Sequence, residues 1–424
     1  MNEEIRETRF ENGLTVLTDR MAGVRSATLG FFYRVGSRNE PDELNGISHF
    51  IEHTVFKGTE RRSAMEIAIE QDRLGGNLDA FTTHEETGFA IKVIDNQLPA
   101  AFDLLADLLS NPRFDATDLE NEQRVIIEEM KMMEDSPEEH LSDLFHREFF
   151  PGHPLGLSIA GTPETVRTFN GEATRSYFKT AYRPANLVIT AAGNIDHDRF
   201  VEMVAETALC SSEANEREKD PIPPTPAAPI IISKRPDLEQ AHMIIAAPFP
   251  DARSKERYAA DLLANIIGGG TSSRLWQKVR EERGLAYSVG ASALMFFDSG
   301  IFSVFAGTSP EQVEEVLDIV LDELRWIVRN GISPDELELM KDQTRASILL
   351  GLEDSAGRAG TLAHMEMVHG RQIPVEETLA AIDAVTAEAV GELAREHFTT
   401  EKIAFAALGD LDKLDIGRER LTIR

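Results

Sequence analysis

The sequence holds almost no cysteine and too little positive charge to balance its negative charge. Of 424 residues, Cys210 is the one cysteine, which excludes an intrachain disulfide and a cluster of cysteine metal ligands. Lysine and arginine total 43 against 73 aspartates and glutamates, giving a formal net charge of −30. Nucleic acid is a poor partner for such a surface, because phosphate binding requires clustered positive charge. An acidic concave surface would instead concentrate basic or neutral peptides, although the charge could equally serve solubility alone.

Long apolar runs are also missing. Stretches such as 187–192 and 230–232 have the length of strands, far below the ~20 apolar residues that a membrane helix needs. The first residues lack a basic segment followed by an apolar one, so we expect no secretory signal. Hydrophobic residues make up 42% and charged residues 27%, an ordinary globular composition that excludes a disordered chain. We therefore expect a soluble, cytoplasmic protein that does not bind a membrane.

A proline-rich segment at 211–229 divides the chain nearly in half. It holds a run of charged residues followed by five prolines between positions 221 and 229. We predict a linker there, because closely spaced prolines suppress both helices and central strands. A chain of this length is expected to form two domains, which we place at 1–210 and 230–424.

The two halves resemble each other in the order of their elements. Each closes with an apolar strand that runs into Gly-polar-apolar-Asp, at 187–196 and at 403–412, so that Gly193 matches Gly409. A weak repeat of this length indicates two homologous domains of one fold. In the first half we predict strands at 14–19, 26–34, 77–83, 87–94 and 186–193, and helices at 46–57, 64–74, 97–110, 116–134 and 137–149. Adjacent strands joined by a short polar turn favour an α+β fold, in which each domain has a mainly antiparallel sheet with helices on one face.

The segment 46–59 carries the residues most suited to chemistry. It contains His49, Glu52 and His53 in the order H-x-x-E-H, within apolar spacing that predicts a helix. Histidines at i and i+4 share one helical face, so both imidazoles could reach a single metal ion. Glu52 lies at the edge of that face, where a carboxylate could take a proton from water without being a ligand. The alternative is a pair of histidines on an ordinary helix.

A zinc hydrolase of this kind needs a third protein ligand and keeps one position open. The acidic segment after Leu119 offers Glu122 and Glu129, which are seven residues apart and hence on one helical face, whereas Glu128 points elsewhere. The alternative is the solvated face of an acidic helix. Spacing alone does not choose Glu129 as the ligand.

Together, these motifs resemble the inverted zinc peptidases of the pitrilysin/insulinase family. The chain is most similar to the half-size branch, which includes the mitochondrial processing peptidase β-subunit and its bacterial relatives. The resemblance implies one zinc ion per chain held by His49, His53 and Glu129, with Glu52 as the general base. It also implies that Glu122 supports the ligands without binding the metal itself.

Two further segments resemble the substrate-binding parts of this family. The first, GGNLDAFTTHEETGF from position 75, resembles an edge strand on which substrate pairs by backbone hydrogen bonds. The residues implied there are Asp79, Ala80, Phe81 and Thr82. The second, at 268–289, resembles a segment whose arginine and tyrosine, here Arg280 and Tyr287, donate to the substrate carbonyl and the developing oxyanion.

The resemblance implies a zinc-dependent endopeptidase that hydrolyses peptides or unfolded segments. The substrate would bind as an extended strand in a chamber closed by two half-shell subunits, either a homodimer or a heterodimer with a related subunit. Aligning the halves sets 46–53 against 258–265, where no metal ligands stand, so only the first domain can be catalytic. Arg280 and Tyr287 would then serve the zinc site of the partner subunit. The alternative is a non-catalytic core or scaffold subunit of the same fold, as in respiratory complexes.

Overall fold

The computed structural model describes residues 4–76, 78–211 and 222–423. Most of the predicted linker at 211–229 lies outside the described residues. Contacts between residues divide the chain into two compact units, each assembled from three segments. Unit 1 consists of Met1–Lys131, Leu157–Ile222 and Ile348–Pro374, and unit 2 of Met132–Gly156, Pro223–Ser347 and Val375–Arg424.

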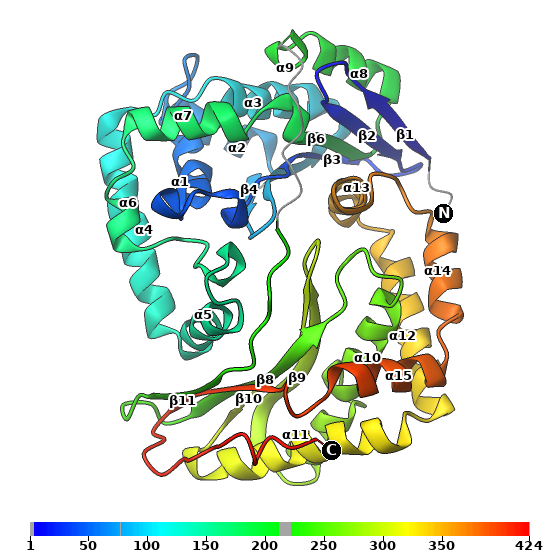
Figure 1. Cartoon of the computed structure of the whole chain (residues 1–424). Coiled ribbons are helices and arrows are strands. Elements are labelled where there is room, and N and C mark those ends of the chain that lie inside the picture. Colours follow the sequence, from blue (N-terminus) through cyan, green and yellow to red (C-terminus); the bar gives the residue numbers. More distant parts are fainter. Residues whose placement is uncertain (1–3, 77, 212–221, 424) are drawn as a thin grey trace. The chain divides into compact units, whose positions relative to one another are not determined.

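Unit 1 is built on a six-stranded sheet with the order β1-β2-β6-β3-β5-β4 (Figure 1). The strands are β1 (Ile5–Arg9), β2 (Thr15–Arg20), β3 (Ser26–Tyr33), β4 (Leu78–Thr82), β5 (Thr87–Ile94) and β6 (Leu187–Gly193). Neighbouring strands are antiparallel, except that β2 runs parallel to β6. The predicted hairpin is confirmed, because β4 and β5 pair as antiparallel neighbours.

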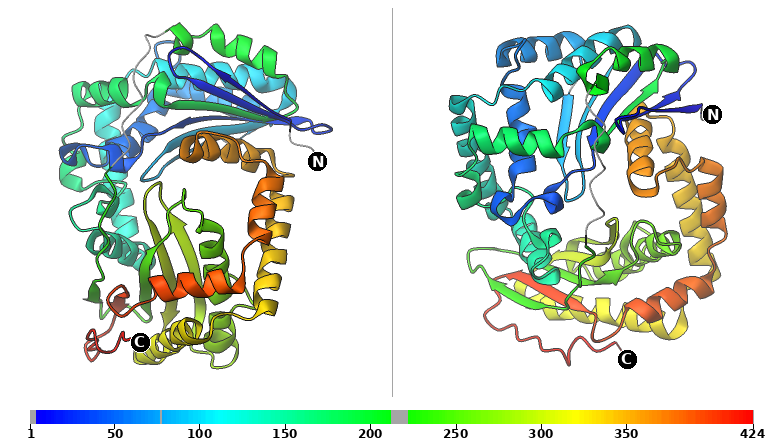
Figure 2. Two further views of the ribbon diagram at one scale, coloured as in Figure 1. Left: turned by 45° about the vertical axis from the view of Figure 1, so that its right-hand side comes forward. Right: turned by 45° about the horizontal axis from the view of Figure 1, so that its top comes forward.

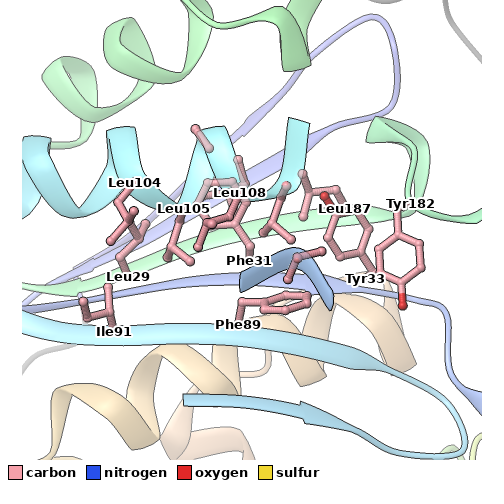
Figure 3. Close-up of a cluster of buried hydrophobic side chains, with 14 of the residues drawn as sticks. Leu29, Phe31, Tyr33, Phe89, Ile91, Leu104, Leu105, Leu108, Tyr182 and Leu187 are labelled. Atoms are coloured by element: carbon pink, nitrogen blue, oxygen red, sulfur yellow. The ribbon is translucent and has the colours of Figure 1, made fainter. Parts of the chain in front are cut away.

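Helices cover both faces of this sheet. α3 (Leu98–Ser110) packs on β3 and β5, and Figure 3 shows Leu104, Leu105 and Leu108 of this helix facing the buried rings of the sheet. α13 (Ser355–His369) contacts β2, β3 and β6 on the other face. Because side chains alternate along a strand, Phe31 belongs to the first apolar layer and its neighbour Phe32 to the second.

The first half contains further helices, some of them predicted from the sequence and some not. They are α1 (Ile47–Thr54), α2 (Ala64–Leu74), α4 (Ala116–Asp135), α5 (Pro137–Phe149), α6 (Pro163–Val166), α7 (Gly171–Ala181), α8 (His197–Ala205) and α9 (Ala208–Ser211). The helix predicted at 46–57 is confirmed as α1 followed by a 3-10 turn, η3 (Val55–Lys57). The helices predicted at 64–74, 97–110, 116–134 and 137–149 are confirmed as α2, α3, α4 and α5.

Charged and polar contacts attach α13 to the sheet of unit 1. Arg358 lies 2.5 Å from Asp19, and both side chains are buried. Glu366, which is fully buried, pairs with Arg9 at 2.8 Å and with Arg34 at 3.3 Å. The helix therefore adds paired charges to an otherwise apolar contact, which leaves each buried carboxylate with a partner.

Unit 2 is built on a five-stranded sheet with the order β7-β11-β8-β10-β9. Its strands are β7 (Ile230–Lys234), β8 (Ala241–Phe249), β9 (Ala286–Met295), β10 (Gly300–Thr308) and β11 (Ala404–Gly409). Its other helices are α10 (Arg257–Gly268), α11 (Val313–Asn330), α14 (Val375–Asp383), α15 (Ala387–His397) and α12 (Pro334–Gly351), whose last residues belong to unit 1. α10, α11 and α15 contact one side of the sheet, whereas α5 packs Leu141, Phe145 and Phe149 against the other.

The predicted internal repeat is confirmed by the two sheets. The order β2-β6-β3-β5-β4 in unit 1 matches β7-β11-β8-β10-β9 in unit 2, including the single parallel pair. Gly193 and Gly409 end the matching strands with φ of 131° and 157°. A Cβ atom would lie 2.8 Å from the Cα of Ala27 at the first position and 2.9 Å from the Cα of Ala241 at the second. Both copies therefore need glycine where the neighbouring strand passes closest.

The structure corrects one part of the predicted fold. Each sheet carries helices on both faces rather than on one, and the helix on the second face comes from the other half of the sequence (Figures 1 and 2). α13 of the second half lies in unit 1, and α5 of the first half lies in unit 2. The compact units therefore differ from the continuous segments 1–210 and 230–424. A sheet with apolar side chains on both faces, such as Phe31 and Phe32, requires a cover on each side.

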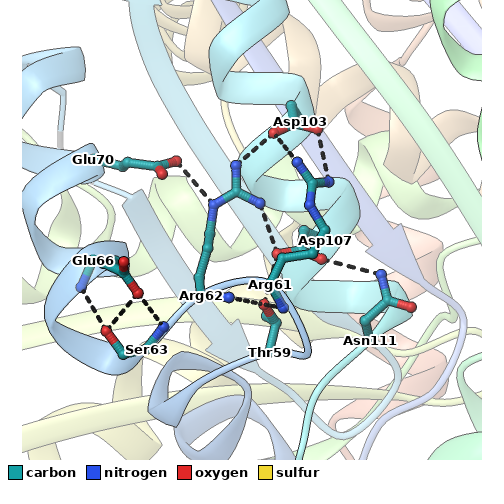
Figure 4. A network of polar contacts seen from close by, with 9 residues as sticks. All are labelled: Thr59, Arg61, Arg62, Ser63, Glu66, Glu70, Asp103, Asp107 and Asn111. Atoms are coloured by element: carbon teal, nitrogen blue, oxygen red, sulfur yellow. Dashed lines mark hydrogen bonds and ion pairs between the residues drawn. The ribbon is translucent and has the colours of Figure 1, made fainter.

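A polar network ties the loop after η3 to α3 and α2 (Figure 4). Asp107 accepts hydrogen bonds from the Thr59 hydroxyl and from the Arg62 guanidinium, both at 2.7 Å. Arg62 also pairs with Glu70 of α2 at 3.0 Å, and Arg61 pairs with Asp103 of α3 at 3.0 Å. These contacts fix the chain as it leaves the helix that carries the H-x-x-E-H motif.

Among the described residues, no helix is both long enough and apolar enough to cross a membrane.

Candidate metal centre

The helix α1 begins on a buried carboxylate. Glu40 accepts hydrogen bonds from the backbone N–H groups of Gly46 at 2.7 Å and Ser48 at 2.8 Å. It thereby satisfies donors that have no partner within the first turn of a helix. Burial raises the pKa of Glu40 to about 7, and these hydrogen bonds oppose the rise. Nothing in the sequence pattern singled out Glu40, because it stands seven residues before the first residue of the helix.

Two histidines of α1 and one glutamate of α4 converge in unit 1. The ring centroids of His49 and His53 are 4.7 Å apart. Glu129 Oε2 lies 3.9 Å from His49 Nε2 and 3.6 Å from His53 Nε2. One ligand atom from each of the three residues falls within 4.8 Å of the other two. Glu128, by contrast, pairs with Lys131 at 2.7 Å and is largely exposed, so of the two glutamates Glu129 is the one that lies beside both histidines.

The protonation of His49 and the unpartnered polar atoms of the site fit a divalent metal. Burial, together with the neighbouring His53, lowers the pKa of His49 to about 4, so its imidazole is neutral near pH 7. Within the described part of the chain, His49 Nδ1 and Glu129 Oε2 are buried without a hydrogen-bond partner. Buried polar atoms are normally paired, and two imidazoles with one carboxylate form a set that zinc accepts. The residues present therefore fit zinc.

Glu122 orients His53 from the side opposite the convergence point. Its carboxylate lies 3.2 Å from His53 Nδ1 and 2.6 Å from Lys57 Nζ. Burial opposes ionisation of both groups, but the hydrogen bond between them raises the pKa of His53 and lowers that of Glu122, which Lys57 lowers further. With Nδ1 engaged by a carboxylate, Nε2 remains for a metal, an arrangement common among metal-bound histidines. Lys57 was missed from the sequence, although it follows His53 by one helical turn.

Glu52 stands beside the two histidines and is held by β4. The hydroxyl of Thr82 donates to Glu52 Oε2 at 2.7 Å. Burial raises the pKa of Glu52 and the nearby Glu129 adds to the rise, whereas Thr82 and His53 oppose it. The carboxylate is therefore poised to accept a proton at a fixed place. Thr82 was predicted only as an edge-strand residue, because its contact with Glu52 depends on how α1 meets β4.

β4 is the last strand of its sheet among the described residues and pairs only with β5. Its side chains alternate: Ala80 and Thr82 are partly buried, whereas Asp79 and Phe81 are exposed. The ring of Phe81 lies 6.3 Å from that of Phe32. The outer edge of β4 thus offers unpaired backbone groups to an extended peptide, directly beside Glu52.

Arg280 and Tyr287 lie together in unit 2, each on an irregular stretch of backbone. Arg280 belongs to a π-helical turn, η7 (Trp276–Glu281). Tyr287 is skipped by the pairing of β9 with β10, because Ser288 opposes Gly307 while Ala286 opposes Thr308. The Arg280 guanidinium carbon lies 4.7 Å from the centre of the Tyr287 ring, which is 80% exposed. π-helical turns and β-bulges are both frequent at functional sites.

Comparison with known proteins agrees with this geometry. The family model for Insulinase (Peptidase family M16) matches residues 15–163, and the model for the Peptidase M16 inactive domain matches residues 168–344. An uncharacterized zinc protease of Streptomyces coelicolor is 37% identical over 398 residues, covering 92% of this chain and 87% of that protein. The chain belongs to the insulinase family of peptidases. The resemblance inferred from the motifs is therefore confirmed.

Solved structures of similar fold extend over almost all of the chain. A protease from Helicobacter pylori superposes with a TM-score of 0.88 at 21% identity, covering 96% of this chain and all of the other. A chain of complex III2 from Candida albicans superposes with a TM-score of 0.84 at 21% identity, covering 98% and 99%. At this identity the likeness shows the fold alone. The inactive-domain model covers α10, which lacks the histidines of α1.

Proposed function

We propose that this chain is a zinc-dependent endopeptidase acting on peptides or unfolded segments. The convergence of His49, His53 and Glu129, with Glu52 beside them, is the observation that carries the proposal. Zinc would be held by the first three residues, one ion per chain. The names of the relatives as zinc proteases support the same conclusion.

The reaction adds water across a peptide bond. Bound zinc supplies Lewis acidity, which polarises the scissile carbonyl and makes water a better nucleophile. Glu52 accepts the proton that water loses as its oxygen bonds to the carbonyl carbon. The same carboxylic acid then returns the proton to the amine nitrogen as the C–N bond breaks. Thr82 holds the carboxylate in position through both transfers, because its hydroxyl donates to Oε2.

The substrate would lie extended along β4 and pair with its free edge. Asp79, Ala80, Phe81 and Thr82 provide the backbone groups for this pairing. Such a mode selects flexible chains over folded proteins, since only an extended segment can add a strand. The net charge of −30 would favour basic peptides. We place the protein in the cytoplasm.

We further propose that Arg280 and Tyr287 act on the zinc site of a partner subunit, in a homodimer or a heterodimer with a related chain. Both residues belong to unit 2, which has no metal ligands matching those of α1 in its described residues. Guanidinium and phenol N–H and O–H groups can stabilise negative charge on a carbonyl oxygen. The two subunits would close around the peptide as half-shells.

A second candidate function is that of a non-catalytic scaffold. The fold of this chain is similar to that of a chain in a complex III2 structure, which favours this alternative. The intact H-x-x-E-H motif and the nearby Glu129 argue against it, because a scaffold needs neither two convergent histidines nor a carboxylate held beside them.

Zinc content and chelation separate these candidates. We expect one zinc per purified chain, cleavage of a Lys- and Arg-containing peptide library, loss of cleavage with a chelator, and recovery when zinc is restored. Chains that contain no zinc and leave every peptide intact would instead support the scaffold.

A further inference from the structure

A second aromatic ring contacts Arg280. The guanidinium carbon lies 4.0 Å from the ring centre of Trp276, one helical turn earlier in η7, and 4.7 Å from that of Tyr287. The indole N–H of Trp276 donates to Glu281 at 3.1 Å, which fixes the plane of the indole. Trp276 is half-buried, and no motif or family likeness described above gives it a role.

The surroundings of Arg280 make it depend on these rings. In the described part of the chain, the one carboxylate within ion-pair distance is Glu281, at 3.9 Å. A comparable pair in the same unit, Arg274 over Trp326 at 4.2 Å, is different. Arg274 is also bound by Glu336 at 2.7 and 3.0 Å, so its position does not require the indole. Arg280 has no comparable carboxylate clamp among the residues that the structure describes.

We propose that Trp276 is a positioning residue that holds the guanidinium of Arg280 in the orientation needed for catalysis. Stacking engages the flat faces of a guanidinium and leaves its N–H edge to donate to an acceptor. An arginine on a flexible side chain loses conformational freedom when it orders itself in each catalytic cycle. The ring of Trp276 removes that cost in advance, as preorganised donors do. The inference rests on the proposed role of Arg280.

The test compares two tryptophans that each contact an arginine. Using a quenched fluorescent peptide rich in Lys and Arg, we expect Trp276→Leu to lower kcat/KM by about 5- to 30-fold, mainly through kcat, because the loss concerns a transition-state donor. Trp276→Phe, which keeps an aromatic face, should retain most of the activity. The matched control Trp326→Leu should stay within about twofold of wild type, since Glu336 still holds Arg274. Equal effects of Trp276→Leu and Trp326→Leu would overturn the proposal.

Fluorescence provides a readout that does not depend on catalysis. Trp276 and Trp326 are the two tryptophans of the chain, so a Trp326→Phe background leaves Trp276 as the only indole. In that background, Arg280→Ala should change the emission of Trp276 and its quenching by acrylamide, whereas Arg274→Ala should not. Unchanged emission after Arg280→Ala would mean that the stack does not form in solution, and the proposal would fail.

The activities of the variants distinguish an error in the role of Arg280 from an error in the role of Trp276. If Arg280→Ala retains full activity, the proposed catalytic role of Arg280 is wrong, and with it the reason to position this side chain. If Arg280→Ala is nearly inactive while Trp276→Leu behaves as wild type, the role of Arg280 stands and the role of Trp276 is wrong.

Discussion

The two copies of the fold use matching helices for different purposes. α1 in unit 1 presents His49, Glu52 and His53 and begins on the carboxylate of Glu40. α10 in unit 2 is longer, and the alignment of the halves sets Asp261 and Asn265 at the positions of the two histidines. Asn265 donates to the backbone carbonyl of Asp261 instead of facing a convergence point. One copy thus carries residues that fit a metal ion, whereas the matching helix of the other copy carries an amide bonded to its own backbone.

The exchanged helices differ in the same way. α13 adds buried ion pairs, among them Arg358–Asp19, to its apolar contact with the sheet of unit 1. α5 is attached to the sheet of unit 2 by aromatic packing through Phe145 and Phe149. The covering helix of this fold can therefore be held by ion pairs or by aromatic packing, provided that each buried charge has a partner. The predictions below challenge this comparison, beginning with the largest effect.

Removing the proposed base should abolish the activity that distinguishes unit 1. Glu52→Gln is expected to lower peptide cleavage by ~10²-fold or more, because general acid–base catalysis contributes that much. Zinc content should remain unchanged, since Glu52 is not a proposed ligand. Asp261→Asn, on the matching helix of unit 2, is the control and should cleave normally. Near-normal cleavage by Glu52→Gln would show that another residue is the base.

Zinc binding should distinguish two adjacent glutamates of α4. Glu129→Gln should weaken zinc binding by ~10²-fold or more, beyond the loss typical of residues that only support a ligand. Glu128→Gln should not, because its side chain faces Lys131. Competition with a chromogenic chelator measures both affinities. Equal losses in the two variants would leave the third ligand without an assignment.

Mixing two inactive variants should show whether unit 2 serves another chain. Glu52→Gln and Tyr287→Phe homodimers should each be nearly inactive. After subunit exchange, about a quarter of wild-type activity is the ceiling, since half of the dimers are mixed and each has one intact site. Proven exchange without recovery of activity would mean that Tyr287 acts within its own chain or not at all.

Breaking a buried ion pair should loosen α13. Asp19→Asn leaves Arg358 buried without its counter-charge, so we expect the free energy of unfolding to fall by about 3–5 kcal/mol. The exposed pair between Arg6 and Asp198 is the control, and Asp198→Asn should leave the free energy of unfolding nearly unchanged. Chemical denaturation of the metal-free protein compares the two. A similar small loss in both variants would show that charge does not hold α13.

The smallest effect concerns the carboxylate at the start of α1. Because the pKa of Glu40 is raised to about 7, the folded state keeps a proton that the unfolded state loses above its ordinary pKa of 4.5. The free energy of unfolding should therefore fall between about pH 4.5 and 7, by about 2–3 kcal/mol relative to Glu40→Gln. Melting temperatures of the metal-free proteins at pH 5 and pH 8 measure this difference. Glu43→Gln, at an exposed position nearby, is the control for the Glu→Gln substitution itself.

Local patterns predicted much of this molecule. The strands, the helices and the repeat followed from periodicity and from the match of Gly193 to Gly409, because these depend on neighbouring residues. His49, Glu52 and His53 were found because their spacing is itself the signal. Glu129 was separated from Glu128 only through the family resemblance, and then by its place beside both histidines.

Contacts between distant segments could not be predicted. The contacts around α1 that involve Thr82, Lys57 and Glu40 arise from the packing of separate elements. No spacing in the sequence indicates them. The exchange of α5 and α13 was missed for the same reason. The hydrophobic pattern of a helix does not tell which of two similar apolar sheet faces it covers.

The exchange of helices has a consequence for how the chain is made. During synthesis, β2, β3 and β6 are complete at Gly193, but the helix that covers Leu17, Phe32 and Val188 ends only at His369. At ordinary ribosomal speeds this apolar face remains uncovered for about 10–35 s before α13 has been synthesised. Neither half, released alone, could finish its own unit, so fragments cut near residue 220 should be insoluble apart and fold only when produced together.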